Sequence, residues 1–65
     1  MKRRELVSRL EQGGCLLVRH GALHDIYKNP VSGRMQPVPR HTEINEMLAR
    51  KILRTLTEKD KGRGN

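Results

Sequence analysis

The stretch from residue 15 to residue 29, CLLVRHGALHDIYKN, decides the fold because it predicts two strands joined by a tight turn. Residues 15–20 lack a helical period and carry a continuous apolar run, which favours a strand covered on at least one face. Gly21 and Ala22 provide the connection. Residues 23–29 alternate as in a strand, and the alternation leaves open which side is buried. The two sides carry Leu23, Asp25 and Tyr27, and His24, Ile26 and Lys28, respectively.

A third strand is predicted for residues 34–40, RMQPVPR, after a five-residue loop, NPVSG. Pro30 fixes the first half of that loop and Gly33 closes it. The strand contains two prolines, which cannot donate hydrogen bonds to a neighbouring strand. We therefore expect it at an edge of the sheet.

Helices are predicted on both sides of the strands. Residues 2–12 place Leu6, Val7 and Leu10 on one face, and Gly13-Gly14 ends that helix. Residues 41–56, HTEINEMLARKILRTL, predict the second helix with Thr42 as its N-cap. Glu43 and Glu46 suit the positive end of its dipole. Its apolar stripe comprises Ile44, Met47, Leu48, Ile52 and Leu56, widened by Ala49 and Leu53.

The fold class that follows is α+β, in the order helix, three strands, helix. A three-stranded antiparallel sheet can bury both helical stripes against one face and leave the other open. Double-stranded-RNA-binding domains use the same layout. We expect one domain over residues 1–58 and a disordered basic tail over residues 59–65.

The net charge points to a polyanionic partner. Among 65 residues, 14 Lys and Arg oppose seven Asp and Glu, giving +7 with neutral histidines. A small domain this basic usually binds nucleic acid, although an acidic protein is a further candidate. No apolar run reaches the ~20 residues of a membrane span, and the basic N-terminus lacks the apolar core of a secretory signal. The expected location is the cytoplasm.

The three histidines suggest acid–base chemistry on RNA. RNA carries its own nucleophile, the 2′-hydroxyl, so one imidazole and a few cations can cleave it without a metal. His24 is the candidate, flanked in sequence by Arg19, Lys28, Arg34 and Arg40. Its neighbour Asp25 points to the opposite strand face and should not orient it.

Ordinary structural roles are expected for the other residues that could take part in chemistry. We expect His20 to be a solvated or hydrogen-bonded surface residue at a strand end, and His41 to have a loop or helix-entry role. Tyr27 is either the main aromatic filler of the core or a base-stacking platform. Cys15 is expected to be an inert buried thiol, and a single cysteine excludes an internal disulfide. The spacing of Cys15 and the histidines matches no zinc motif, so no metal or cofactor is expected.

Three motifs resemble HicA, the toxin of HicA–HicB toxin–antitoxin pairs: RHGALHDIYKNP, PVPRHTEI and LARKIL, within a similarity from Arg4 to Glu58. The resemblance implies the fold in its double-stranded-RNA-binding form and a metal-independent ribonuclease that cuts messenger RNA. It also implies a HicB antitoxin that covers the active site. The family's catalytic histidine opens the second strand three residues before an aromatic, which here matches His24 and not His20 or His41.

The resemblance leaves several points open. Close relatives have glycine and serine where this chain has Ala22 and Leu23, so the substrate preference or rate can differ. The group that protonates the leaving oxygen is unassigned among Lys28, Arg34, Arg40 and His41. Residues expected to bind RNA are Arg19, Lys28, Arg34, Arg40 and Tyr27.

Other functions compete with the ribonuclease, and the main one is a non-catalytic double-stranded RNA-binding module. The acidic start of the second helix, TEINE, disfavours it, because such modules begin that helix with lysines. A ribosomal component is a further alternative, and a DNA-binding protein is weaker because no helix-turn-helix pattern is present. We expect the free toxin to be a monomer that forms a hetero-oligomer with its acidic antitoxin.

Overall fold

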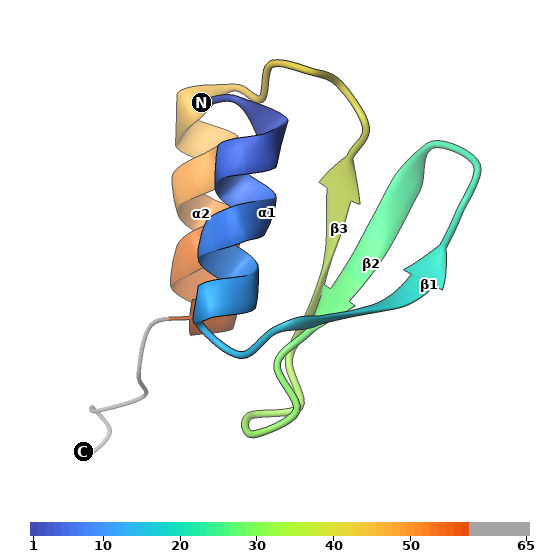
Figure 1. Ribbon diagram of the computed structural model, residues 1–65, viewed down its shortest axis with the longest axis vertical. Helices are drawn as coiled ribbons and strands as arrows, with labels where there is room; N and C mark the ends of the chain where they lie inside the picture. The colour runs from blue at the N-terminus through green and yellow to red at the C-terminus, as the bar shows by residue number, and fades with distance from the viewer. Residues whose placement is uncertain (58–65) are drawn as a thin grey trace.

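The computed structural model describes residues 1–57, which form an α+β fold (Figure 1). Helix α1 covers Arg3–Gln12 and helix α2 covers Glu46–Thr57. Between them lie strands β1 (Leu16–His20), β2 (His24–Lys28) and β3 (Met35–Pro39). The predicted order of elements is confirmed, whereas the expected tail over residues 59–65 lies outside the described residues. Within residues 1–57, neither helix has the length and apolar character needed to cross a membrane.

The sheet is antiparallel with β2 in the centre. On β3, Pro39 pairs with His24 and Met35 pairs with Lys28. On β1, the register shifts between Leu17 and Arg19, which is a β-bulge. The strand that contains the prolines, β3, lies at an edge of the sheet, which confirms the prediction. An edge strand tolerates proline because its outer side needs no N–H donor.

Both helices pack on one face of the sheet, as expected, and lie side by side (Figure 1). The alternation of β2 is settled by this packing: Asp25 and Tyr27 are buried, whereas His24 is exposed on the opposite face. The core is aliphatic apart from one aromatic ring and one thiol. It consists of Leu6, Leu10, Cys15, Tyr27, Val38, Ile44, Ala49, Ile52 and Leu56.

The expectation that the first strand is covered on one face is wrong. All five residues of β1 are exposed, and its apolar side chains Leu16, Leu17 and Val18 retain about half of their accessible surface. The reason is the position of the strand in the sheet. The helices lie on the side of β3, so β1 is the edge farthest from them (Figure 1).

The second helix starts later than the sequence pattern predicts, at Glu46, and Asn45 is its N-cap in place of Thr42. Asn45 Oδ1 accepts hydrogen bonds from the backbone N–H groups of Met47 (2.9 Å) and Leu48 (3.2 Å). Thr42 is engaged elsewhere, because its carbonyl accepts a 2.8 Å hydrogen bond from Arg3 N–H. Tertiary pairing of this segment with the N-terminus therefore keeps it out of the helix.

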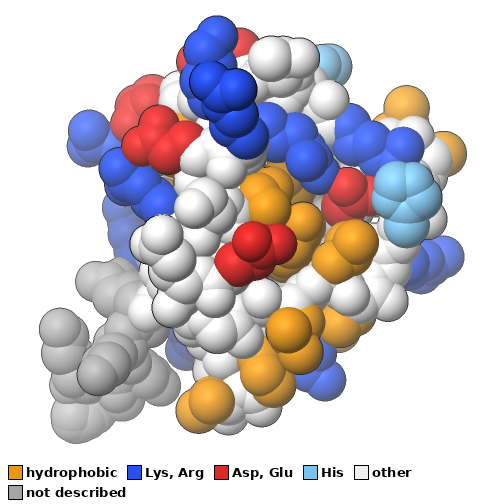
Figure 2. Space-filling view, viewed as in Figure 1, with side chains coloured by type: hydrophobic (Ala, Val, Ile, Leu, Met, Phe, Trp, Pro, Cys, Tyr) orange, Lys and Arg blue, Asp and Glu red, His pale blue; other side chains and the backbone are white. Residues whose placement is uncertain are grey.

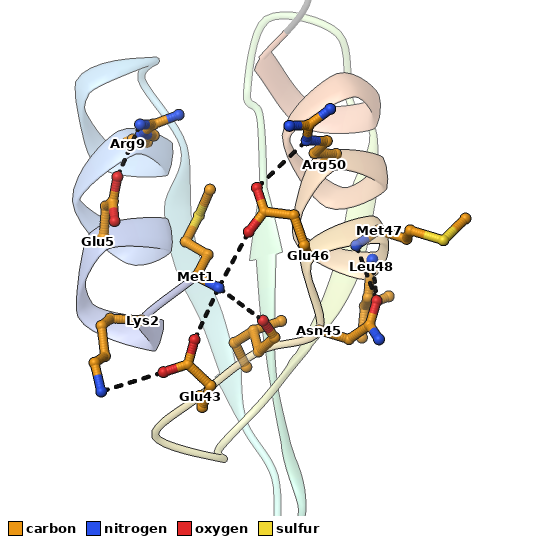
Figure 3. A network of polar contacts seen from close by, with 11 residues as sticks. Met1, Lys2, Glu5, Arg9, Glu43, Asn45, Glu46, Met47, Leu48 and Arg50 are labelled. Carbon is orange, nitrogen blue, oxygen red and sulfur yellow. Dashed lines mark hydrogen bonds and ion pairs between the residues drawn. The ribbon is translucent and has the colours of Figure 1, made fainter.

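That pairing extends over the first residues of the chain (Figure 3). Lys2 and Glu43 form an isolated antiparallel bridge, and Ile44 N–H donates to the Met1 carbonyl. The Met1 ammonium also contacts Glu43 (2.9 Å) and Glu46 (3.2 Å). Hydrogen bonds from this ammonium hold the pKa of both carboxyl groups below their ordinary values. The segment before α2 is thus tied to α1.

Part of the predicted apolar stripe faces solvent. Met47 is 81% exposed and Leu48 is 37% exposed, so their assignment to the buried stripe is wrong. With the helix starting at Glu46, its buried positions are Ala49, Ile52 and Leu56. At 100° per residue, Met47 lies about 200° from Ala49 and points away from the sheet.

Candidate active site

His24 lies where β2 begins, on the sheet face opposite the helices, and its side chain is exposed. Two surface hollows meet at this residue. One has a volume of about 310 Å³ and is lined by Arg19, Gly21, Ala22, Leu23, His24 and Ile26. The other has a volume of about 360 Å³ and is lined by Ala22, Leu23, His24, Arg40 and His41.

The turn before β2 fixes the start of that strand. The backbone N–H of Gly21 donates a 2.9 Å hydrogen bond to the carbonyl of His24. A Cβ atom at position 21 would lie 2.6 Å from the same oxygen, so the close approach requires glycine. Ala22 and Leu23 form the tip of the turn and line both hollows. Ala22 and Leu23, which stand where the resemblance to HicA implies glycine and serine, are therefore next to His24.

The register of the sheet brings Arg40 and His41 to His24, although they are distant in sequence. Because His24 pairs with Pro39, the two residues after β3 emerge beside the start of β2. Arg40 and His41 both line the second hollow. An arrangement of two imidazoles and one guanidinium can move protons and stabilise negative charge at the same place.

Asp25 anchors the cations behind this hollow. It lies on the face of β2 opposite His24, as predicted, and this face is the one that packs against the helices, so Asp25 does not orient His24. Its carboxylate accepts hydrogen bonds from Arg3 Nη2 (2.6 Å) and Arg40 Nε (3.1 Å), and His20 Nδ1 lies 2.8 Å away. Burial by itself would raise the pKa of Asp25. The charge and hydrogen bond of Arg40, together with His20, outweigh burial and lower this pKa.

His20 is a hydrogen-bonded surface residue at the end of β1, as expected, and its partners belong to the candidate site. Its side chain is 70% exposed, yet it contacts Asp25, and its ring nitrogens lie 3.0 and 3.1 Å from Arg40 Nη2. Arg40 is held on two sides, by a carboxylate and by an imidazole. His20 is thus a neighbour that restrains Arg40, and it lines neither hollow at His24.

The cations of the N-terminal segment lie next to the candidate site, and the sequence analysis did not place them there. Arg3 donates to Asp25 and also, through Nε, to the carbonyl of Pro39 at 2.8 Å. Figure 2 shows Lys and Arg side chains gathered near the N-terminal end of α1, with a histidine and an acidic side chain at one end of the group. The sequence contained a signal for such a contact. Asp25 shares a strand face with Tyr27, and if that face is buried, the carboxylate requires cationic or hydrogen-bonding partners.

The residues expected to bind RNA do not all gather at His24. Arg19 and Arg40 line its hollows. Lys28 shares the face of β2 with His24 but lies at the other end of the strand, and Arg34 directly precedes the residue that pairs with Lys28. Tyr27 is 5% exposed in the core, so it offers no free ring face for stacking on a base. The core-filling interpretation is the one that fits its position.

The cysteine and histidine side chains do not form a metal site in the described part of the chain. No group of three or more His, Cys, Asp or Glu side chains suited to a metal ion occurs among residues 1–57. Cys15 is buried, and its Sγ lies 3.6 Å from the carbonyl of Leu56. Burial raises the pKa of this thiol, which favours the unreactive protonated form.

The fold and the hollow together define the class of the protein. It is a small basic α+β protein in which two exposed histidine side chains lie beside arginine side chains. A family model for the HicA toxin of bacterial toxin–antitoxin systems matches residues 3–57 of the 65-residue chain. The chain therefore belongs to the HicA toxin family. Comparison with curated proteins and with solved structures gives no significant match.

Proposed function

We propose that this toxin is a metal-independent endoribonuclease that cleaves messenger RNA in the cytoplasm, with His24 as a catalytic residue. The observation that carries the proposal is the hollow that His24 shares with His41 and Arg40. Membership of a toxin family and the net charge of +7 support a polyanionic target inside the cell.

The chemistry needs only groups that line this hollow. One imidazole removes the proton of the 2′-hydroxyl, and the 2′ oxygen forms a bond to the adjacent phosphorus. The bond from phosphorus to the 5′ oxygen breaks, and that oxygen takes a proton from a second acid. The products are a 2′,3′-cyclic phosphate and a free 5′-hydroxyl. Arg40 is placed to stabilise the negative charge that develops on the phosphoryl oxygens.

His41 is the best candidate for the second acid–base group. Four residues were open at the sequence level, and of these only Arg40 and His41 line a hollow with His24. Arginine stays protonated at physiological pH and cannot exchange a proton there. An imidazole has one ring nitrogen that can donate a proton and one that can accept it, so His41 suits the transfer better.

The proposal is tested by cleavage of a labelled single-stranded RNA in excess EDTA. We expect His24→Ala to lower the cleavage rate by about 10²- to 10⁴-fold. We expect His41→Ala to lower it as well, and Arg54→Gln, an exposed change on α2, to leave it unchanged. RNA with a 2′-deoxy nucleotide at the cleavage position should not be cut. Equal rates for the parent and His24→Ala would refute the catalytic assignment.

The same variants separate the enzyme from the alternative function. In bacteria, induction of the parent should arrest growth and deplete transcripts, whereas induction of His24→Ala should do neither. Tight RNA binding that His24→Ala retains, with no cleavage by the parent, would instead indicate a non-catalytic double-stranded RNA-binding module. Circular dichroism of each variant verifies that the fold is retained.

We also propose that a HicB-type antitoxin binds this toxin and covers His24. An acidic partner suits the charge of the chain. The open sheet face adds apolar surface, since Leu16 and Met35 are more than half exposed, and the turn beside it adds Leu23, which is 75% exposed. We expect the affinity to fall as salt is raised, without vanishing, because the apolar contacts are not screened. An affinity that does not change with salt would refute the charge-based part of this proposal.

A further inference from the structure

A second basic hollow adjoins the one at His24. It has a volume of about 360 Å³ and is lined by Lys2, Arg3, Arg4, Arg40 and Thr42. Its walls come from two segments that are distant in sequence. They are held together by the hydrogen bond from Arg3 N–H to the Thr42 carbonyl (2.8 Å) and by the bridge between Lys2 and Glu43. The basic hollow is therefore a product of tertiary structure.

The cations of the basic hollow are only partly neutralised. Arg3 and Arg40 share one carboxylate, Asp25. Lys2 contacts Glu43 at 3.2 Å, but both side chains are about 60% exposed and such a pair contributes little. Arg4 has no ion pair among residues 1–57. The lining contains four cations and no acidic side chain.

Arg3 and Arg4 lie in the first turn of α1, where positive charge is unfavourable to the helix, and Glu5 is the acidic residue of the same turn. Lys2, at the N-cap position, makes no side-chain capping hydrogen bond. Residues that break a local rule of stability are often placed for function. An anion bound in the basic hollow would offset the repulsion among its cations.

The position of Arg40 connects the basic hollow to the proposed cleavage site. Arg40 lines both the basic hollow and the hollow that contains His24 and His41. A polymer of phosphodiesters that places one phosphate beside His24 therefore meets the basic hollow directly next to it. Asp25 holds Arg3 and Arg40 in place before any ligand arrives, which lowers the entropic cost of binding.

We propose that the basic hollow is a phosphate subsite, which binds a phosphodiester of the RNA strand next to the one that is cleaved. This inference rests on the proposed ribonuclease function for its substrate class. Arginine side chains suit the role, because the planar guanidinium donates two parallel hydrogen bonds to a phosphate. The hydroxyl of Thr42 can add a further donor.

The test measures RNA binding without cleavage, in the His24→Ala background, with a labelled ten-nucleotide single-stranded RNA. Lys2→Gln/Arg4→Gln removes two cations from the basic hollow. Lys51→Gln/Arg54→Gln is the matched control, because it removes two exposed cations from α2. The dissociation constant is measured over a range of potassium chloride concentrations for each protein.

We expect the first pair of substitutions to reduce the slope of log Kd against log salt by about 0.7 for each phosphate that the protein no longer neutralises. The control pair should leave the slope unchanged. Equal slopes for the two double variants would overturn the subsite, since the cations of the basic hollow would then act only through net charge. The subsite would also be overturned if the ten-nucleotide RNA failed to bind the His24→Ala protein that carries no further substitution.

A second measurement uses substrate length in proteins that retain His24. A dinucleotide has a single phosphate, so Lys2→Gln/Arg4→Gln should cleave it as the parent does. With a ten-nucleotide substrate the same variant should show a higher KM and a similar kcat, because the subsite contributes to binding. A KM that rises equally for both substrates would overturn the subsite. Failure of the proposed function is distinct, because it would appear as equal cleavage by the parent and His24→Ala.

Discussion

Replacement of Gly21 by alanine tests whether the hairpin turn positions the proposed catalytic histidine. A Cβ atom at position 21 would lie 2.6 Å from the carbonyl oxygen of His24, and the next nearest atom is the carbon of the same carbonyl at 3.8 Å. That oxygen belongs to the backbone, so it cannot rotate away as a flexible side chain would. Because the peptide group is planar, a shift of the oxygen also shifts the peptide that follows His24.

The size of the shift follows from ordinary contact distances. To reach a normal van der Waals separation, the Cβ atom and the oxygen must move apart by about 0.8 Å. A displacement near 1 Å at a catalytic group can lower a rate by about 10²-fold. The hydrogen bond from Gly21 N–H to the His24 carbonyl, 2.9 Å long, would also be broken or weakened. Its loss costs about 1 kcal/mol, which corresponds to a fall in Tm of about 4–8 °C in a domain of this size.

The assay pairs RNA cleavage with thermal unfolding, and Gly13→Ala is the matched control. A Cβ atom at Gly13 would lie 2.8 Å from Cγ2 of Thr57, so this substitution is also crowded. It lies at the C-terminal end of α1, far from the turn before β2 (Figure 1). We expect Gly13→Ala to lower Tm and leave cleavage unchanged, whereas Gly21→Ala should lower cleavage by about 10- to 100-fold. Parental cleavage and parental Tm for Gly21→Ala would refute the reasoning.

Two further predictions concern the helix start and the buried carboxylate. Asn45→Ala should lower the free energy of unfolding by about 1 kcal/mol, because it removes the N-cap of α2, whereas Thr42→Ala should have a clearly smaller effect in the same thermal melts. A larger loss for Thr42→Ala would contradict the observed cap. Because the pKa of Asp25 is lowered, its stabilising contribution is present above the ordinary aspartate pKa of about 3.9 and is lost as the pH falls through the lower folded value. Asp25→Asn should therefore be less stable than the parent at pH 7, with a difference that shrinks below about pH 3.9, and the exposed change Glu11→Gln is the control. A difference that does not depend on pH in urea titrations would contradict this assignment.

The sequence by itself predicted the elements of the fold and their order. The helical spacing in residues 2–12 and the aliphatic residues of α2 indicated the two helices. The prolines of β3 placed that strand at an edge, because proline cannot donate in the ladder, and this was confirmed. The motifs resembling HicA predicted the family that the family model then matched. These signals are short in range, since each lies within one element or its immediate flanks.

Tertiary structure decided what local patterns do not contain. The polarity of β2 is similar on its two sides, so only the packing of the helices selected the Asp25 side for burial. Thr42 is a suitable cap residue by type, but pairing of its backbone with Arg3 moved the helix start to Glu46. The meeting of His24 with Arg40 and His41 depends on the register of two strands that a single-residue slip would undo. The basic hollow depends on the contact between two segments distant in sequence. Hydrogen-bond register and packing act between elements, so they set which residues meet, whereas periodicity within an element sets only which residues share a face.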